Sequence, residues 1–243
     1  MEKKINVTIF NENYHDKNDY CVCHYPNGMH NAIKAGLEVD PCFNVTIATQ
    51  DMEECGLTDE VINNTDVMFW WGHVKHHEVP DYIVEKVHKR VLGGMGLVVL
   101  HSGHFSKLFK KLMGTGCDLK WRCSNDKERF WVVNPSHPIA DGIPQCFELE
   151  HEEMYGEHFD IPAPDELVFI SWFSGGEVFR SGCTFRRGNG KIFYFRPGHE
   201  SCPSYNNEFV LKVIRNAAHW ACPANATFQH YGKFDSLENP ESK

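Results

Sequence analysis

The sequence lacks an apolar run long enough to cross a bilayer, for which a helix needs about 20 residues. Its start, MEKKINVTIF, is charged and then strand-like, without the apolar segment of a signal peptide. Cationic residues are also few, since 24 Lys and Arg stand against 33 Asp and Glu and the net charge is -9. A phosphate backbone requires a basic surface, which this composition disfavours. We therefore expect a cytoplasmic protein that binds a small molecule and has no nucleic-acid or membrane partner.

The sequence also lacks pairs of cysteines at the spacing of a metal or redox motif. None of the ten cysteines has the CxxC spacing of a metal or redox motif, and a reducing compartment disfavours disulfide bonds. A thiol nucleophile needs a neighbouring cation or a helix N-terminus that lowers its pKa. No cysteine follows a recognisable strand-to-helix turn, so we predict that none is catalytic and that most are small buried hydrophobic residues.

What the sequence does contain is a regular alternation of apolar strands and helices. Its hydrophobic content of 42% over 243 residues is enough for a full core. The strand-like runs cover 5–10, 44–50, 66–72 and 96–103, and the helical patterns between them cover 27–39, 58–63 and 77–94. This alternation predicts an α/β fold with a doubly wound, mostly parallel sheet.

The alternation stops after about residue 117. The following stretch is rich in aromatic residues, proline and charge, with short strand candidates at 129–133 and 146–151. We expect an antiparallel insertion over about 117–165, after which apolar strands and a closing helix at 206–221 resume the α/β pattern. Residues 1–222 then form a single domain, and 223–243 form a polar C-terminal tail.

Three of the apolar runs end at a histidine. They are MFWWGH (68–73), GLVVLHSGH (96–104) and KIFYFRPGHE (191–200). In open α/β sheets, ligands bind beyond the carboxyl ends of the strands, so these histidines should line one crevice. Neutral imidazoles that converge suit a divalent ion such as Zn or Mn. His73, His101 and His199 are therefore candidate metal ligands.

Other polar residues follow the same strand ends. Glu12 and His15 come after the first strand, while His104 and Glu200 stand next to candidate ligands, so we interpret these four as catalytic proton-transfer groups. Arg196 at a strand end suggests recognition of substrate hydroxyl groups or anions. One carboxylate of ELEHEEMYGEHF (148–159) reaching the crevice would complete a His/carboxylate shell.

The segment GLVVLHSGHFSKLFKKLMG reads as a strand, a tight turn and a helix, and such a turn lifts one side chain above the sheet. His101 or Ser102 is the lifted group. Ser102 as a hydrolase nucleophile is a weaker alternative, because LHSGH lacks the G-x-S-x-G spacing.

Together, these segments resemble the ThuA-like (trehalose utilisation) family of the class I glutamine amidotransferase-like superfamily. The resemblance spans about residues 5–222 and is carried by VTIFNENYHDK, WWGHVKHHEV, GLVVLHSGHFSK, HPIADGIP, EEMYGE and RPGHE. It implies a flavodoxin-like fold. In the amidotransferases the turn reads G-x-C-x-G, and setting VLHSGH against that pattern puts His101 where the nucleophilic cysteine would be. The resemblance thus implies a retained crevice and a changed reaction.

The resemblance also assigns further residues. The Glu-x-Tyr signature of the family falls on Glu153 and Tyr155, so we take Glu153 as the carboxylate ligand and Tyr155 as substrate-binding, together with Arg196. Trp71 is an aromatic candidate for stacking on a sugar face. The family is associated with trehalose and related disaccharides through 3-keto intermediates, which implies a sugar substrate and a divalent metal ion.

The leading hypothesis is a metal-dependent enzyme that acts on a keto-sugar or keto-glycoside by proton abstraction, isomerisation or bond cleavage. The alternative is a noncatalytic carbohydrate-binding or regulatory protein that kept the amidotransferase-like fold after losing its cysteine. A hydrolase with a rearranged serine or cysteine triad is a third, weaker hypothesis. The sequence leaves open the metal, the exact substrate and whether the chain forms a homo-oligomer.

Overall fold

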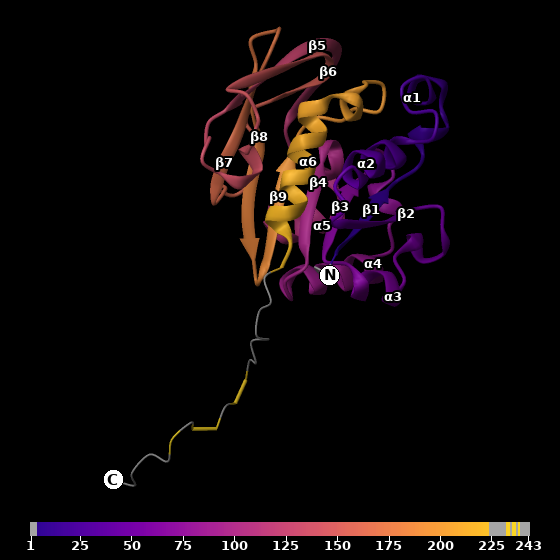
Figure 1. Ribbon diagram of the computed structural model, residues 1–243, viewed down its shortest axis with the longest axis vertical. Coiled ribbons are helices and arrows are strands. Elements are labelled where there is room, and N and C mark those ends of the chain that lie inside the picture. Colours follow the sequence, from indigo (N-terminus) through magenta and orange to yellow (C-terminus); the bar gives the residue numbers. More distant parts are fainter. Residues whose placement is uncertain (1–3, 224–231, 234, 237, 239–243) are drawn as a thin grey trace.

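The computed structural model describes residues 4–223, 232–233, 235–236 and 238, so most of the predicted tail at 223–243 lies outside the described residues. Nine strands form one sheet in the order β2-β1-β3-β4-β9-β8-β7-β5-β6 (Figure 1). The strands are β1 (Ile5–Asn11), β2 (Phe43–Thr49), β3 (Val67–Trp71), β4 (Gly96–Leu100), β5 (Lys120–Val132), β6 (Cys146–Gly156), β7 (Glu166–Phe173), β8 (Val178–Arg187) and β9 (Gly190–Phe195).

The α-helices are α1 (Asp19–Val22), α2 (Met29–Glu38), α3 (Asp59–Asn64), α4 (Asp81–Leu92), α5 (Lys107–Met113) and α6 (Glu208–Ala221). The described residues also contain six 3₁₀ turns: η1 (His15–Lys17), η2 (Glu53–Gly56), η3 (His76–Glu78), η4 (His101–Phe105), η5 (Pro138–Ala140) and η6 (Ser204–Asn206). Helices α5 and α6 begin with side-chain caps, because Ser106 accepts a hydrogen bond from the Phe109 amide and Asn207 accepts from Phe209 and Val210.

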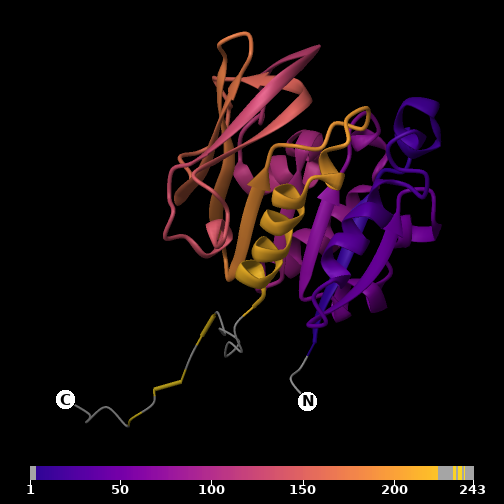
Figure 2. The ribbon, with the colours of Figure 1, turned by 45° about the horizontal axis from the view of Figure 1, so that its top comes forward.

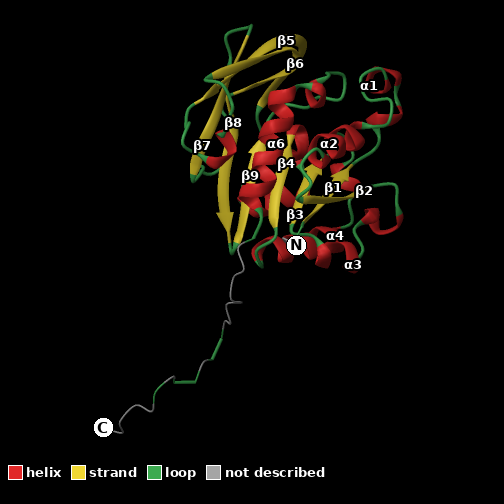
Figure 3. Ribbon diagram, viewed as in Figure 1, coloured by secondary structure: helices red, strands yellow, loops and turns green. Residues whose placement is uncertain are grey.

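The parallel half contains β2, β1, β3, β4 and β9, and all neighbouring pairs in it are parallel. Every residue of β3 and of β4 is buried, as expected for strands covered on both faces. Helices α2 and α6 pack on one face and α4 and α5 on the other, and α2 and α6 lie side by side in Figure 3. The predicted doubly wound parallel sheet is therefore confirmed, with a switch point between β1 and β3.

The antiparallel half is longer than the predicted insertion at 117–165. Strand β8 runs antiparallel to β9, β7 to β8, and β5 to both β7 and β6, so the antiparallel part continues to Arg187. Strands β7 and β8 form an antiparallel hairpin, so the apolar run of β7 marks burial and not the direction of the neighbouring strand. Figure 2 shows these strands as a layer beside α6. Among the described residues, no helix has the length and apolarity that a membrane span requires.

Candidate functional site

The carboxyl ends of β1, β3, β4 and β9 meet at one edge of the sheet, beside the first residues of β5 and the last residues of β6. A cavity of about 530 Å³ opens there. The residues that line it are His73, Val74, His76, Ser102, His104, Phe105, Asp118, Leu119, Trp121, Cys123, Glu153, Tyr155, His199 and Glu200. The parallel half thus supplies most of the histidines, and the antiparallel half supplies a carboxylate and aromatic rings.

His101 occupies a strained turn directly after β4. Its φ of 49° lies in the left-handed region, which residues other than glycine rarely adopt. The turn also needs Gly103, because a Cβ there would lie 2.8 Å from the Trp70 carbonyl oxygen and 3.0 Å from Val99. Nδ1 of His101 donates to the Arg196 carbonyl oxygen at 3.1 Å, so Nε2 is the nitrogen left to face the site.

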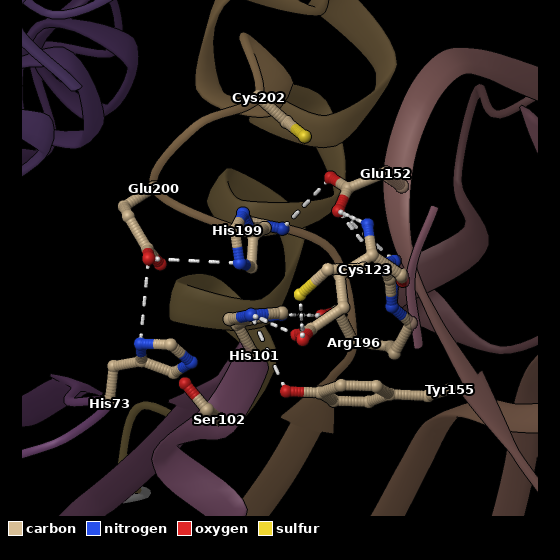
Figure 4. A network of polar contacts seen from close by, with 12 residues as sticks. His73, His101, Ser102, Cys123, Glu152, Tyr155, Arg196, His199, Glu200 and Cys202 are labelled. Carbon is tan, nitrogen blue, oxygen red and sulfur yellow. Dashed lines mark hydrogen bonds and ion pairs between the residues drawn. The ribbon is translucent and has the colours of Figure 1, made fainter. Parts of the chain in front are cut away.

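Four predicted ligands come together around Nε2 of His101. One ligand atom from each of His73, His101, Glu153 and His199 lies within 4.8 Å of the others, and we call this group the first cluster. Figure 4 shows its three histidines. Nε2 of His101 is 3.3 Å from Oε2 of Glu153. Within the described part of the chain, that oxygen is buried and has no hydrogen-bond partner.

The protonation states of the first cluster suit a cation. Burial and the charge of His101 lower the pKa of His73 to about 3, and the same two causes lower the pKa of His199. Burial raises the pKa of Glu153, but the neighbouring His101 and His199 outweigh it, so the pKa lies below its usual range. At neutral pH, His73 and His199 therefore offer free lone pairs beside a carboxylate.

His15, His73 and Glu200 form a second cluster, with ligand atoms again within 4.8 Å of one another. Nε2 of His15 is 3.0 Å from Nδ1 of His73. Oε1 of Glu200 is 3.4 Å from Nδ1 of His15 and 3.5 Å from Nδ1 of His73. His73 belongs to both clusters, so the two groups are adjacent.

Glu12 does not lie in the cavity, contrary to its predicted catalytic role. Its two carboxylate oxygens accept hydrogen bonds from the backbone amides of His73, Val74 and Lys75 at 2.7, 3.1 and 2.8 Å. A carboxylate saturated by backbone donors is poorly placed to move a proton. Glu12 instead holds the loop that carries His73.

Trp71 and Arg196 were predicted to bind substrate, and the structure contradicts both assignments because both side chains are fully buried and neither lines the cavity. The indole nitrogen of Trp71 donates to the Gly198 carbonyl oxygen at 3.0 Å. Strand residues alternate between the two faces of a sheet and the strand end is covered on both, so these side chains point into the core.

Arg196 fixes the positions of groups in the first cluster through hydrogen bonds. Its guanidinium donates to Glu128 at 2.7 Å, to Glu152 at 2.8 Å and to the Glu153 carbonyl oxygen at 2.6 Å. Its own carbonyl oxygen accepts from His101. The buried arginine thus fixes the backbone of one candidate ligand and the ring orientation of another.

The buried pair of carboxylates beside Arg196 predicts a pH dependence of stability. Burial raises the pKa of Glu128 from 4.5 to about 8, with the charge of Arg196 lowering it and the charge of Glu152 raising it. Between these values the folded chain holds one more proton than the unfolded chain, so the free energy of unfolding should fall as pH rises through this window, by up to about 1.4 kcal/mol per pH unit.

We expect Glu128→Gln to remove this slope, measured by urea unfolding at pH 5, 6, 7 and 8. Glu148→Gln changes a partly exposed carboxylate whose pKa is lowered by Arg129, and it should keep the wild-type slope. Equal slopes in wild type and Glu128→Gln would contradict the prediction.

His104 and Tyr155, both predicted site residues, do line the cavity. Nδ1 of His104 donates to the Cys117 carbonyl oxygen at 2.7 Å, which leaves Nε2 as the free nitrogen. Burial lowers the pKa of His104 to about 3, so the ring is neutral. The Tyr155 ring stacks on His101 with centroids 5.0 Å apart, and its hydroxyl is 3.4 Å from Nε2 of His101.

Ser102, the alternative nucleophile, lines the cavity, but its hydroxyl donates to the Gly72 carbonyl oxygen at 2.9 Å. That hydrogen bond uses the proton that a catalytic base would have to take.

Comparison with known proteins identifies the family and the fold. The model of the ThuA family, described as trehalose utilisation, matches residues 6–221. The chain belongs to the ThuA family. A search of curated proteins finds no match.

Three solved structures illustrate the shared fold of this ThuA family member. A ThuA-like protein of Parabacteroides merdae is 16% identical over 90% of both chains, with a TM-score of 0.68. A cytoplasmic protein of Salmonella typhimurium is 11% identical over 90% of this chain and all of the other, with a TM-score of 0.57. PurLQS of Thermotoga maritima is 14% identical over 89% of this chain and 99% of its own, with a TM-score of 0.56. The predicted amidotransferase-like fold is therefore confirmed.

Sequence reasoning missed several cavity residues of this ThuA family member. Three of them, Asp118, Trp121 and Cys123, come from the start of the antiparallel half and line the cavity. Trp121 is 65% exposed, and Sγ of Cys123 donates to Oε1 of Glu153 at 3.1 Å. No local pattern marks these residues, because only the pairing of β5 with β6 brings them to the site.

We expect Cys123→Ser to leave turnover within about tenfold of wild type, because the thiol is not a nucleophile. Burial and the hydrogen bond to Glu153 raise its pKa to about 12, so it stays protonated at neutral pH. Turnover of the purified variant checks the prediction. Stoichiometric inactivation of wild type by iodoacetamide, relieved by substrate, would contradict it.

Proposed function

We propose that this ThuA family member is a metal-dependent enzyme of carbohydrate utilisation that binds a keto-sugar or keto-glycoside in the cavity and moves the proton next to its ketone. The observation that carries the proposal is the first cluster, where three imidazoles and a carboxylate converge on one point. The description of the family as trehalose utilisation supports a sugar substrate.

The donor set fits a divalent ion. Oε2 of Glu153 is buried, and no group in the described residues gives it a hydrogen bond, which is costly for a carboxylate unless a cation binds there. His101, His199 and Glu153 supply the nitrogen and oxygen ligands that Zn or Mn accepts, with His73 as a fourth. When bound, the ion would polarise the carbonyl or hydroxyl oxygen of the sugar.

The other residues of the cavity orient the histidines, accept the proton and contact the sugar. His101 is oriented by the Arg196 carbonyl oxygen and His104 by the Cys117 carbonyl oxygen. Neutral His104 offers its free nitrogen to the cavity, where it can accept the proton next to a ketone. Trp121 at the rim and Tyr155 deeper in the cavity provide faces on which a sugar ring can stack.

Deuterium exchange tests this function directly. Untagged protein, loaded with Zn²⁺ or Mn²⁺ and freed of excess ion, would be incubated with 3-ketotrehalose or a 3-keto-glucoside in D₂O and followed by NMR. We expect deuterium to appear at the carbon next to the ketone, and EDTA treatment to abolish it. Sugar binding without metal uptake and without exchange would overturn the proposal in favour of a noncatalytic binding protein.

A further inference from the structure

The second cluster lies beside the first, and two of its members, His15 and Glu200, have no role in the proposed reaction. It combines two imidazoles and one carboxylate, from His15 after β1, His73 after β3 and Glu200 after β9. The side chain of Glu200 is 6% exposed, and among the described residues its Oε2 is buried without a hydrogen-bond partner. Each cluster therefore contains one buried carboxylate with an unpartnered oxygen.

The spacing within the second cluster resembles that of ligands around one ion. Oε1 of Glu200 lies 3.5 Å from Nδ1 of His73. Hydrogen bonds from nitrogen to oxygen are usually 2.7–3.2 Å long. Ligands held tetrahedrally at 2.0–2.1 Å are about 3.3–3.4 Å apart. The distance to His73 matches this ligand spacing better than it matches a hydrogen bond, and Nε2 of His15 lies 3.0 Å from the same Nδ1.

Among the described residues, Glu200 has no lysine or arginine partner. Its ion-pair contacts there are with His15, His73 and His199. The nearby cation Arg196 is engaged by Glu128 and Glu152. Burying a carboxylate without a fixed cation beside it is unfavourable, and a divalent ion would remove the penalty.

The ring orientations leave the required lone pairs. Nδ1 of His15 is 2.6 Å from the Tyr20 hydroxyl, and when Nδ1 donates to that oxygen, Nε2 is free for an ion. A neutral imidazole has a single free lone pair, so His73 can serve one ion at a time. Nδ1 of His73 faces His15 and Glu200, as Figure 4 shows for Glu200.

We propose that His15, His73 and Glu200 form a second divalent cation site, adjacent to the site of the first cluster. With both sites filled, His73 binds the second ion through Nδ1, and His101, Glu153 and His199 hold the first. Three protein ligands are the number found at catalytic zinc sites, which keep one position open. This inference rests on the proposed function only for the first ion, and it replaces the proton-transfer roles predicted for His15 and Glu200.

Ion counting tests the second site without any activity assay. Untagged full-length protein would be stripped with EDTA, titrated with Zn²⁺ or Mn²⁺, freed of excess ion and analysed by mass spectrometry for bound metal. We expect two ions per chain in wild type, and one in His15→Ala and in the nearly isosteric Glu200→Gln. His101→Ala should also bind one ion, at the second site. His219→Ala alters a surface histidine that contacts Asp40 at 2.8 Å, and this control should still bind two ions.

The remaining outcomes separate the two proposals. One ion in wild type that persists in Glu200→Gln and is lost in His101→Ala overturns the second site and leaves the proposed function intact. One ion that is lost in Glu200→Gln and kept in His101→Ala overturns the ligand set of the proposed function. No bound ion overturns both. Circular dichroism of each variant, which should match wild type, excludes loss of folding as the cause.

Discussion

Replacing His101 by alanine is expected to remove the ion of the first cluster and most turnover with it. His101 lies at the centre of the site, with Nε2 3.3 Å from Glu153 and its ring stacked on Tyr155. Loss of a residue that only orients a ligand costs about 10–100-fold in metal affinity, so loss of a ligand should cost at least ~100-fold. Isothermal titration with Zn²⁺ and assay of deuterium exchange on the same preparation measure the two effects.

His104→Ala is the matched comparison, because it removes a cavity histidine that lies outside both clusters. Acid–base groups contribute about 10²–10⁴ in rate, so turnover should fall by that factor while the affinity for the ion of the first cluster stays near that of wild type. Equal metal loss in both variants would show that the ligand set is wrong. Unchanged turnover in both would favour the noncatalytic binding protein.

The sequence predicted the parts of the site that follow from strand ends. Runs of buried apolar residues mark parallel strands, and parallel strands that end at one edge must bring their following residues together. This rule alone is enough to group His73, His101 and His199. Glu153 was predicted only through the family resemblance. Several carboxylates lie on the same antiparallel strand, and no local feature shows which of them points into the site.

What could not be predicted is which strand-end side chains point into the cavity and which point into the core. Arg196 and Glu12 have the polar character of site residues, yet their partners come from distant segments or from the backbone of another loop. Glu128 lies 68 residues before Arg196 in the chain, and the length of the antiparallel half that brings them together was itself underestimated. A sequence alone does not distinguish a buried polar residue that supports the site from a polar residue that contacts substrate.

Arg196→Met is expected to be the most destabilising single change at the site. The guanidinium is fully buried between Glu128 and Glu152, which are also fully buried. Removing one partner of a buried ion pair typically costs about 3–5 kcal/mol, because a buried charge is left uncompensated. Urea unfolding at pH 7 measures this loss. Arg129→Met provides the control, since Arg129 pairs with Glu148 at the surface and such pairs are worth about 0–1 kcal/mol.

Arg196→Met should also weaken the binding of the ion at the first cluster, although Arg196 touches none of the candidate ligand atoms. Arg196 holds the Glu153 carbonyl oxygen at 2.6 Å, and its own carbonyl oxygen orients His101. Adding Glu128→Gln and Glu152→Gln to Arg196→Met removes the two buried acids that lose their partner, so this triple variant should regain part of the lost stability. It should still bind Zn²⁺ about 10–100-fold more weakly than wild type, the effect expected when support for ligands is lost. Wild-type Zn²⁺ affinity in the triple variant, or a stability loss in Arg196→Met no larger than in Arg129→Met, would show that the buried arginine does not organise the site.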